Sequence, residues 1–248
     1  MVSLYDIIIK NPIQINGGIM GIPSKVKVTS LVLKLIVTTS AVVGTILSAR
    51  AAINLFMSGS RVFMFFTIQS NIAIALLSVI GAAILIKKPL TSGLWPVIVF
   101  VGTISITLTG AVFTFILAPT LGESAWNLQN ILTHVVVPTA AIADFLITGA
   151  YFNIKKKCVF CVIIPPGAYA VYAGIGYLAG WEFAEGCNYP YFFLNWGSPA
   201  GAFGFTKEMP FMGCVWWILL LLLLLIAVGY AYLFILDGIK KVIKKQGK

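Results

Sequence analysis

The chain has 248 residues, of which 60% are hydrophobic and 10% are charged. Soluble domains carry about 25% charged residues, so this composition excludes a water-soluble globular protein and indicates an integral membrane protein. The net charge of +10 comes largely from short lysine clusters between apolar runs. That placement is typical of membrane topology and argues against a nucleic-acid partner.

Apolar runs predict six membrane-spanning helices, and therefore an all-α bundle. Each run has about 20 or more mostly apolar residues, enough to cross a hydrocarbon core about 30 Å thick. We place the spans near 31–55, 63–86, 95–117, 129–150, 159–180 and 212–236. The chain then divides into an N-terminal segment (1–30), a six-span domain (31–236) and a basic tail (237–248).

The lysines predict how the bundle is oriented. Lysine clusters precede the first span and follow the second, fourth and sixth spans. Six crossings place all four clusters on one face, which the positive-inside rule identifies as the inner face. We therefore expect both termini to be cytoplasmic and the aromatic-rich segment 181–211 to lie outside. That segment is either a belt of aromatic side chains at the headgroup level or a lid over the outer helix ends.

The second span opens with a group of polar residues at its outer end, within the stretch FFTIQSNIAIALL (65–77). The group consists of Thr67, Gln69, Ser70 and Asn71. Thr67 and Asn71 are four residues apart, so they share one helix face, and Ser70 lies close to them. Polar atoms at this depth are costly unless they have partners, so we expect these side chains to meet polar groups of another helix.

The fourth span carries a matching polar stripe. Asn127, Asn130 and His134 follow one another at spacings of three and four residues, so they share one face of an otherwise apolar helix. Both spans run inward from the outer face. Thr67 and His134 should therefore lie at the same depth, roughly 5–8 Å inside their helix starts at about 1.5 Å per residue. We expect these two side chains to face each other.

A hydroxyl beside an imidazole is the minimal nucleophile–base pair for acyl transfer, and His134 is the one histidine of the sequence. The first turns of two helices would add backbone N–H groups for a developing oxyanion. Spacing alone favours a structural alternative, in which Thr67 bonds back to a carbonyl one turn earlier and His134 joins helices. No metal-ligand cluster of the usual spacing exists, so we expect no metal and no other cofactor.

Two further features remain open at this point. Asp144 lies near the middle of the fourth span, where an unpaired charge is costly. We expect it to be protonated, bonded to a Tyr or Thr of a neighbouring helix, or exposed to a wet cavity, with a structural hydrogen bond favoured over a proton relay. Cys187 and Cys214 both fall on the outer side. A disulfide between them in an oxidising compartment would pin the aromatic segment.

The stretches FFTIQSN (65–71) and NLQNILTHVVVP (127–138) together resemble those of the androgen-induced-gene family of membrane proteins. The likeness is closest to the prokaryotic six-span members, whose Tyr/Pro/Phe-rich outer segment is similar to NYPYFFLN (188–195). Animal members are atypical hydrolases of fatty acid esters of hydroxy fatty acids, and they use a Thr nucleophile with a His. The resemblance places these two roles on Thr67 and His134.

The resemblance implies an intramembrane hydrolase of lipid esters. In such an enzyme His134 would take the proton of the Thr67 hydroxyl as that hydroxyl attacks an ester carbonyl. The surrounding pocket residues would be Gln69, Ser70, Asn71 and Asn130, with Asn71 or Asn130 orienting the imidazole. The resemblance also favours the plasma membrane of a prokaryote as the location.

Other interpretations of the same residues stay open. Arg50, near the outer end of the first span, would bind a fatty acid carboxylate or, as we favour, extend to the lipid headgroups. A transporter or channel would use the polar outer group as a vestibule, although no internal repeat supports this alternative. A non-catalytic lipid-binding protein would keep the fold without turnover.

Overall fold

The computed structural model describes residues 22–53 and 59–246. The protein is 77% helical, and these two ranges contain no β-strand. Among the described residues, six helices are long and apolar enough to cross a membrane, at Ser24–Ile53, Phe66–Lys87, Leu94–Trp126, Leu128–Gly149, Lys156–Leu178 and Cys214–Lys245. The predicted all-α bundle of six membrane-spanning helices is confirmed.

Several of these spans are composites of shorter elements. The first two and the last are continuous α-helices, named α2 (Ser24–Ile53), α3 (Phe66–Lys87) and α9 (Cys214–Gln246). The third consists of α4 (Leu94–Val112), the π-helical η2 (Phe113–Leu117), α5 (Ala118–Leu121) and the 3-10 helix η3 (Gly122–Trp126). The fourth consists of α6 (Leu128–Ile131), the π-helical η4 (Leu132–Val136) and α7 (Val137–Gly149). The fifth joins η5 (Lys156–Ile163) to α8 (Ile164–Leu178).

A proline accounts for the π-helical turn in the third span and in the fourth. Pro119 and Pro138 follow η2 and η4 closely. Proline has no N–H, and its ring clashes with the carbonyl four residues before it. A π-turn widens the helix at such a point and is frequent at functional sites. In η4 the carbonyl affected is that of His134, so the sequence itself distorts the helix at the histidine.

The first helix at its start and the last helix at its end extend beyond the apolar runs that predicted them. α2 begins at Ser24, before the predicted boundary at 31, and α9 continues to Gln246, well beyond 236. Hydropathy marks the part of a helix that meets hydrocarbon, whereas hydrogen bonding continues into the water beyond it. Lys244 and Lys245 in the last turn of α9 are also favourable at the negative end of the helix dipole.

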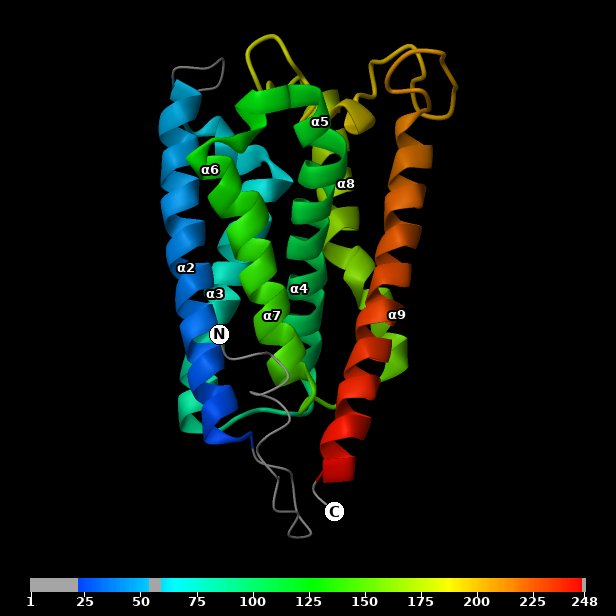
Figure 1. Ribbon diagram of the computed structural model, residues 1–248. Coiled ribbons are helices and arrows are strands. Elements are labelled where there is room, and N and C mark those ends of the chain that lie inside the picture. The colour runs from blue at the N-terminus through cyan, green and yellow to red at the C-terminus, as the bar shows by residue number, and fades with distance from the viewer. Residues whose placement is uncertain (1–21, 54–58, 247–248) are drawn as a thin grey trace.

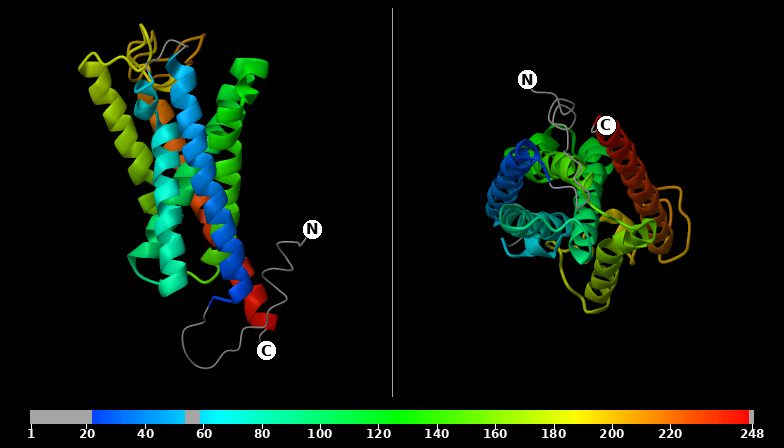
Figure 2. Two further views of the ribbon diagram at one scale, coloured as in Figure 1. Left: turned by 90° about the vertical axis from the view of Figure 1, so that its left-hand side faces the viewer. Right: turned by 90° about the horizontal axis from the view of Figure 1, so that it is seen from below.

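The six spans form a ring of four helices with two helices on its flank. α2, α3, α4 and α7 contact one another in a closed cycle, and α8 and α9 pack on α4 (Figures 1 and 2). Phe100 of α4 and Phe145 of α7, both fully buried, anchor the main core, with Leu225 of α9 against them. α8 and α9 therefore meet the ring along α4, and we call the line between α4 and these two helices the seam.

The two ends of the bundle differ in chemistry. α2 begins and α9 ends at one end, which we call the basic end because it carries the lysine clusters (Figure 1). At the opposite end, called the loop end, α3 begins and segment 179–213 connects α8 to α9 (Figure 1). The positive-inside rule predicts that the loop end is the outer one.

Candidate functional site

Thr67 lies in the first turn of α3, at the loop end. The helix begins without a side-chain cap, since Phe65 occupies the N-cap position. The first N–H groups of a helix have no partner within it and must find one elsewhere. The Thr67 N–H donates to the phenol oxygen of Tyr191 (N···O 3.3 Å), which also lies 3.4 Å from the Thr67 hydroxyl oxygen. Thus the side chain of Tyr191, which lies in the segment between α8 and α9, caps the start of α3.

Aromatic packing holds Tyr191 over this helix start. Its ring stacks on Phe193 with centroids 5.1 Å apart, and meets Phe65 edge-on at 5.9 Å. Burial raises the pKa of the Tyr191 phenol above its usual value. The hydroxyl therefore stays protonated through the physiological pH range and remains a hydrogen-bond donor.

The segment 181–211 combines the two roles considered for it. Tyr191 and Phe193 cover the start of α3, as a lid does. Phe203 and Phe205, in contrast, are 64% and 74% exposed. Rings exposed in this way are suited to the headgroup region, so the later half of the segment has the character of an aromatic belt.

A pocket of about 600 Å³, including the space at its open mouth, lies beside Thr67. It follows the seam between α4 and the flanking helices. Its walls are hydrocarbon from residues such as Leu108, Val112 and Leu221, and no charged side chain is among its described lining residues. Partly exposed residues on three elements line it as well: Leu117 of η2, Pro166 of α8 and Leu222 of α9. At this depth the exposed side of a membrane-spanning helix faces lipid, so these residues place the open side of the pocket toward the bilayer.

Four hydroxyls line the pocket, and two of them have firm partners. Thr109 pairs with the Ser70 hydroxyl at 2.7 Å, and Tyr169 donates to the Met64 carbonyl at 3.0 Å. The contacts between Thr67 and Tyr191, in contrast, are long, at 3.3 and 3.4 Å, and neither hydroxyl makes a shorter hydrogen bond within the described residues. Long hydrogen bonds are weak. These two hydroxyls are therefore the ones that a ligand can most easily engage.

His134 lies inside the four-helix ring, buried on η4. Its imidazole stacks on Phe113 of η2, with centroids 4.0 Å apart and planes inclined by 22°. Its Nδ1 lies 3.1 Å from the Asn130 carbonyl oxygen and 3.0 Å from the Thr133 hydroxyl. A carbonyl only accepts hydrogen bonds, so Nδ1 of the neutral ring carries the proton, and Nε2 keeps its lone pair. In this tautomer Nε2 is the nitrogen that can act as a base.

Thr67 and His134 are not hydrogen-bonded to each other, and His134 does not line the pocket. Asn71 connects their backbones: its Nδ2 donates to the Thr67 carbonyl at 2.8 Å and to the Thr133 carbonyl at 3.1 Å. The Asn71 side chain is fully buried, and its Oδ1 has no partner in the described structure. Buried acceptors of this kind are usually satisfied by a bound water.

The other residues predicted around the pair take structural positions. Ser70 donates to the Thr67 carbonyl at 3.0 Å, and Gln69 donates to the Phe63 carbonyl at 3.1 Å, which holds the turn before α3. The Asn130 side chain donates to the Ala125 carbonyl, so it is the Asn130 backbone that orients the imidazole. Arg50 is exposed in the last turn of α2 and does not line the pocket.

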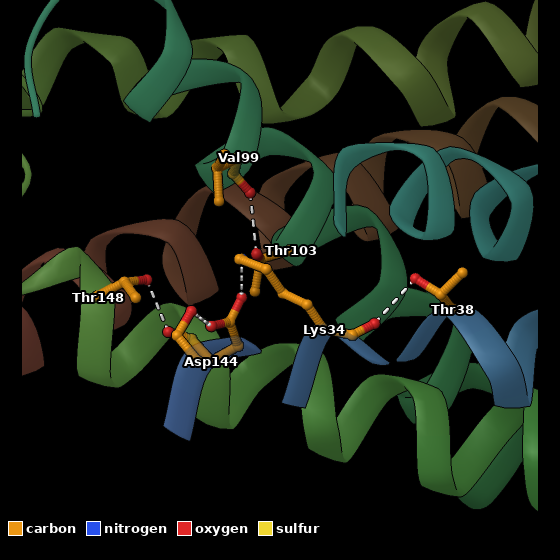
Figure 3. Close-up of polar contacts among 7 residues, drawn as sticks. Lys34, Thr38, Val99, Thr103, Asp144 and Thr148 are labelled. Atoms are coloured by element: carbon orange, nitrogen blue, oxygen red, sulfur yellow. Dashed lines mark hydrogen bonds and ion pairs between the residues drawn. The ribbon is translucent and has the colours of Figure 1, made fainter. Parts of the chain in front are cut away.

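A second buried polar group lies deeper, toward the basic end. Asp144 of α7 accepts hydrogen bonds from Lys34 and Ser30, both on α2, and forms an ion pair with Lys34 (Figure 3). Lys34 and Asp144 are only 8% and 6% exposed. Gly81 of α3 gives the ammonium room, because a Cβ there would lie 3.3 Å from Lys34 Nζ. Asp144 thus has a structural hydrogen-bonding role, as expected, but its partners are Lys and Ser rather than Tyr or Thr.

The described residues contain neither a metal-ligand cluster nor a disulfide. No group of three or more His, Cys, Asp or Glu side chains is placed to hold a metal ion there. Cys158, Cys161, Cys187 and Cys214 are free thiols, and Cys187 donates to the Tyr189 carbonyl at 3.4 Å. The aromatic segment is therefore held without a disulfide.

Comparisons of this chain with known protein families, with curated proteins and with solved structures find no match.

Proposed function

We propose that the protein is an intramembrane hydrolase of lipid esters, with Thr67 as its nucleophile. The observation that carries the proposal is the position of the Thr67 hydroxyl on the wall of a hydrocarbon-lined pocket that follows a seam in the bundle. An acyl chain would lie against α4, α8 and α9, with its ester group at the start of α3. Fatty acid esters of hydroxy fatty acids, named by the family resemblance, are one substrate class of this kind.

The proposed reaction has two steps, acylation of Thr67 and hydrolysis of the acyl-enzyme. The Thr67 oxygen attacks the ester carbonyl carbon, its proton leaves to a base, and the alcohol departs with a proton, which leaves an acyl group on Thr67. Water then attacks the acyl-enzyme, and the same base removes a proton from that water. The products are the alcohol and a free fatty acid, and Thr67 regains its proton.

His134 is the proposed base, and it would act through a bound water rather than by direct contact with Thr67. Its Nε2 has the free lone pair, but no hydrogen bond joins it to Thr67. The unpartnered Asn71 Oδ1 supports a bound water between the two helices. Such a water would carry the proton from the Thr67 hydroxyl to the imidazole. A direct transfer would require the Thr67 side chain to rotate toward η4.

The full-length protein in lipid nanodiscs, supplied with a fluorogenic long-chain fatty acyl ester, tests the proposal. Thr67→Val removes the nucleophile with little change in volume, so we expect the hydrolysis rate to fall by about 10³-fold or more. Thr107→Val is the matched control, because the Thr107 hydroxyl also pairs with a tyrosine hydroxyl, that of Tyr232, at 2.9 Å. Equal rates in the wild type and Thr67→Val would overturn the proposal.

His134 does not line the pocket, and this favours one alternative, a lipid-binding protein without turnover. In that case the wild type would bind a radiolabelled fatty acid ester and release it unchanged. The Leu222→Trp variant, which fills the mouth of the pocket, would lose binding. Hydrolysis that depends on Thr67 decides against this alternative.

A further inference from the structure

The structure assigns Tyr191 a catalytic role in the proposed hydrolysis, on which this inference rests. We infer that the Tyr191 O–H and the Thr67 N–H together bind the carbonyl oxygen of the ester. They then stabilise the negative charge that develops on this oxygen when Thr67 attacks. The loop that covers α3 would thus supply half of an oxyanion hole.

The positions of the two donors support this role. The Thr67 nitrogen and the Tyr191 phenol oxygen are 3.3 Å apart, and the phenol oxygen is 3.4 Å from the attacking hydroxyl. Oxyanion donors act at about 2.7–3.1 Å from the oxygen they stabilise. The Thr67 N–H would exchange its long hydrogen bond to the phenol oxygen for one to the ester oxygen, and two donors separated by 3.3 Å can then both reach that single oxygen. The same oxygen would be bonded to the carbon that Thr67 attacks.

The chemistry of the pocket suits this assignment. The Thr67 N–H belongs to the first turn of α3, where the helix dipole favours negative charge. The phenol stays protonated because burial raises the pKa of Tyr191. No charged residue is among the described lining residues, so two neutral donors in a hydrocarbon setting meet the developing charge. Donors in such a water-poor site are stronger than they are in water.

The charge movement follows a simple course. As the Thr67 oxygen forms a bond to the carbonyl carbon, the π-electron pair of the carbonyl moves onto its oxygen, which both donors hold. When the tetrahedral intermediate collapses, that pair re-forms the carbonyl, and the alkoxide leaves with a proton from the imidazolium of the proposed base. Tyr191 keeps its own proton throughout and acts only as a donor.

The alternative role of Tyr191 is to cap α3 without any part in the reaction. A cap contributes to folding, and its loss is expected to lower stability. It would not change the reactivity of a correctly folded protein. An oxyanion donor, in contrast, changes the rate of reaction at Thr67 while substrate affinity stays nearly constant. The two roles therefore give different kinetic results.

The experiment measures the second-order rate at which a long-chain alkyl fluorophosphonate reacts with full-length protein in nanodiscs. Tyr191→Phe removes the phenol oxygen, and we expect this rate and kcat for ester hydrolysis to fall by about 10²–10³-fold with KM little changed. Tyr232→Phe is the matched control, because it breaks the other Thr–Tyr hydroxyl pair, which lies outside the pocket. We expect it to react at the wild-type rate.

Each outcome of this experiment decides the matter. If the wild type reacts at Thr67 and Tyr191→Phe reacts as fast, the oxyanion role is wrong and the proposed hydrolase stands. If the wild type shows no reaction or hydrolysis that depends on Thr67, the proposed function and this inference fall together. If Tyr191→Phe does not fold, the structure of the wild-type phosphonyl adduct replaces it. There the phosphoryl oxygen should lie within about 3.1 Å of both Tyr191 Oη and Thr67 N, and an oxygen turned away from them contradicts the inference.

Discussion

Two polar groups of this bundle differ in how firmly they are held. At the loop end, Thr67 and Tyr191 are neutral, and their contacts are 3.3 and 3.4 Å long beside an open pocket. Toward the basic end, Lys34 and Asp144 are charged, closely paired and almost completely buried. Weak neutral contacts can be exchanged for a ligand, whereas a buried ion pair cannot be opened without a large penalty. The difference agrees with the proposed reaction at the first group and with helix association at the second.

The packing around the two groups agrees with this division. The ion pair joins α2 to α7 within the ring of four helices, and a second, smaller pocket of about 340 Å³ touches it at Lys34. No described residue lines both this pocket and the one beside Thr67. The two pockets are therefore separate, and the described structure offers no shared polar lining between them for a transported solute.

The largest expected effect comes from breaking the ion pair. Lys34→Met leaves Asp144 as an unpaired buried charge, which should lower the free energy of unfolding by about 3–5 kcal/mol. The double variant Lys34→Met/Asp144→Leu removes both charges and should recover most of this loss. Denaturant unfolding in detergent micelles measures both values. A single variant as stable as the wild type would show that the pair does not hold α2 to α7.

A smaller effect is expected from crowding the helix that carries His134. A Cβ at Gly44 of α2 would lie only 2.6 Å from the Thr133 methyl carbon, Cγ2. Gly44→Ala should therefore lower the free energy of unfolding by about 1–3 kcal/mol and slow hydrolysis by displacing the imidazole. Gly167→Ala is the control, because a Cβ there meets nothing within 4 Å. Equal stability and activity in the two variants would contradict this packing.

How far the sequence predicts such features depends on how local they are. The spans follow from the lengths of the apolar runs, and helical spacing predicts a shared depth for Thr67 and His134. The Lys34–Asp144 pair had a usable signal, since two opposite charges fell inside predicted spans. Tyr191 had none, because a tyrosine in an outer loop carries no buried charge that calls for a partner, and its contact with Thr67 depends on the fold of that loop.

The sequence also could not predict that the His134 imidazole is not hydrogen-bonded to Thr67. Equal depth constrains two side chains along the membrane normal, but it leaves their rotation about the helix axes free. The π-turn before Pro138 alters that rotation at His134, and Phe113 then stacks on the ring. Helical spacing assumes a regular α-helix, so it cannot anticipate this change.

Filling the pocket should affect catalysis more than stability. Leu222→Trp places an indole at the pocket, and we expect kcat/KM for a long-chain ester to fall by about tenfold, which is about 1.4 kcal/mol. Leu223→Trp is the control, because Leu223 is 65% exposed and does not line the pocket. The comparison is made by steady-state kinetics with long and short acyl chains. The same loss in both variants would place the acyl chain elsewhere.

The smallest effect is expected at the surface of the lid. Arg61 and Glu182 form an ion pair with N···O 2.9 Å, and their side chains are 29% and 50% exposed. Arg61→Ala should lower the free energy of unfolding by only about 0.2–1 kcal/mol, and less at high salt. Thermal unfolding at two ionic strengths measures it. A loss as large as that of Lys34→Met would mean that the exposed pair, too, holds the bundle together.

The most direct measurement locates the nucleophile itself. Full-length protein in nanodiscs is treated with the long-chain alkyl fluorophosphonate, digested, and mapped by tandem mass spectrometry. We expect a single phosphonyl adduct on Thr67, absent from Thr67→Val and retained in Thr107→Val. An adduct on a different residue, or equal labelling of the wild type and Thr67→Val, would contradict the assignment of Thr67 as the nucleophile.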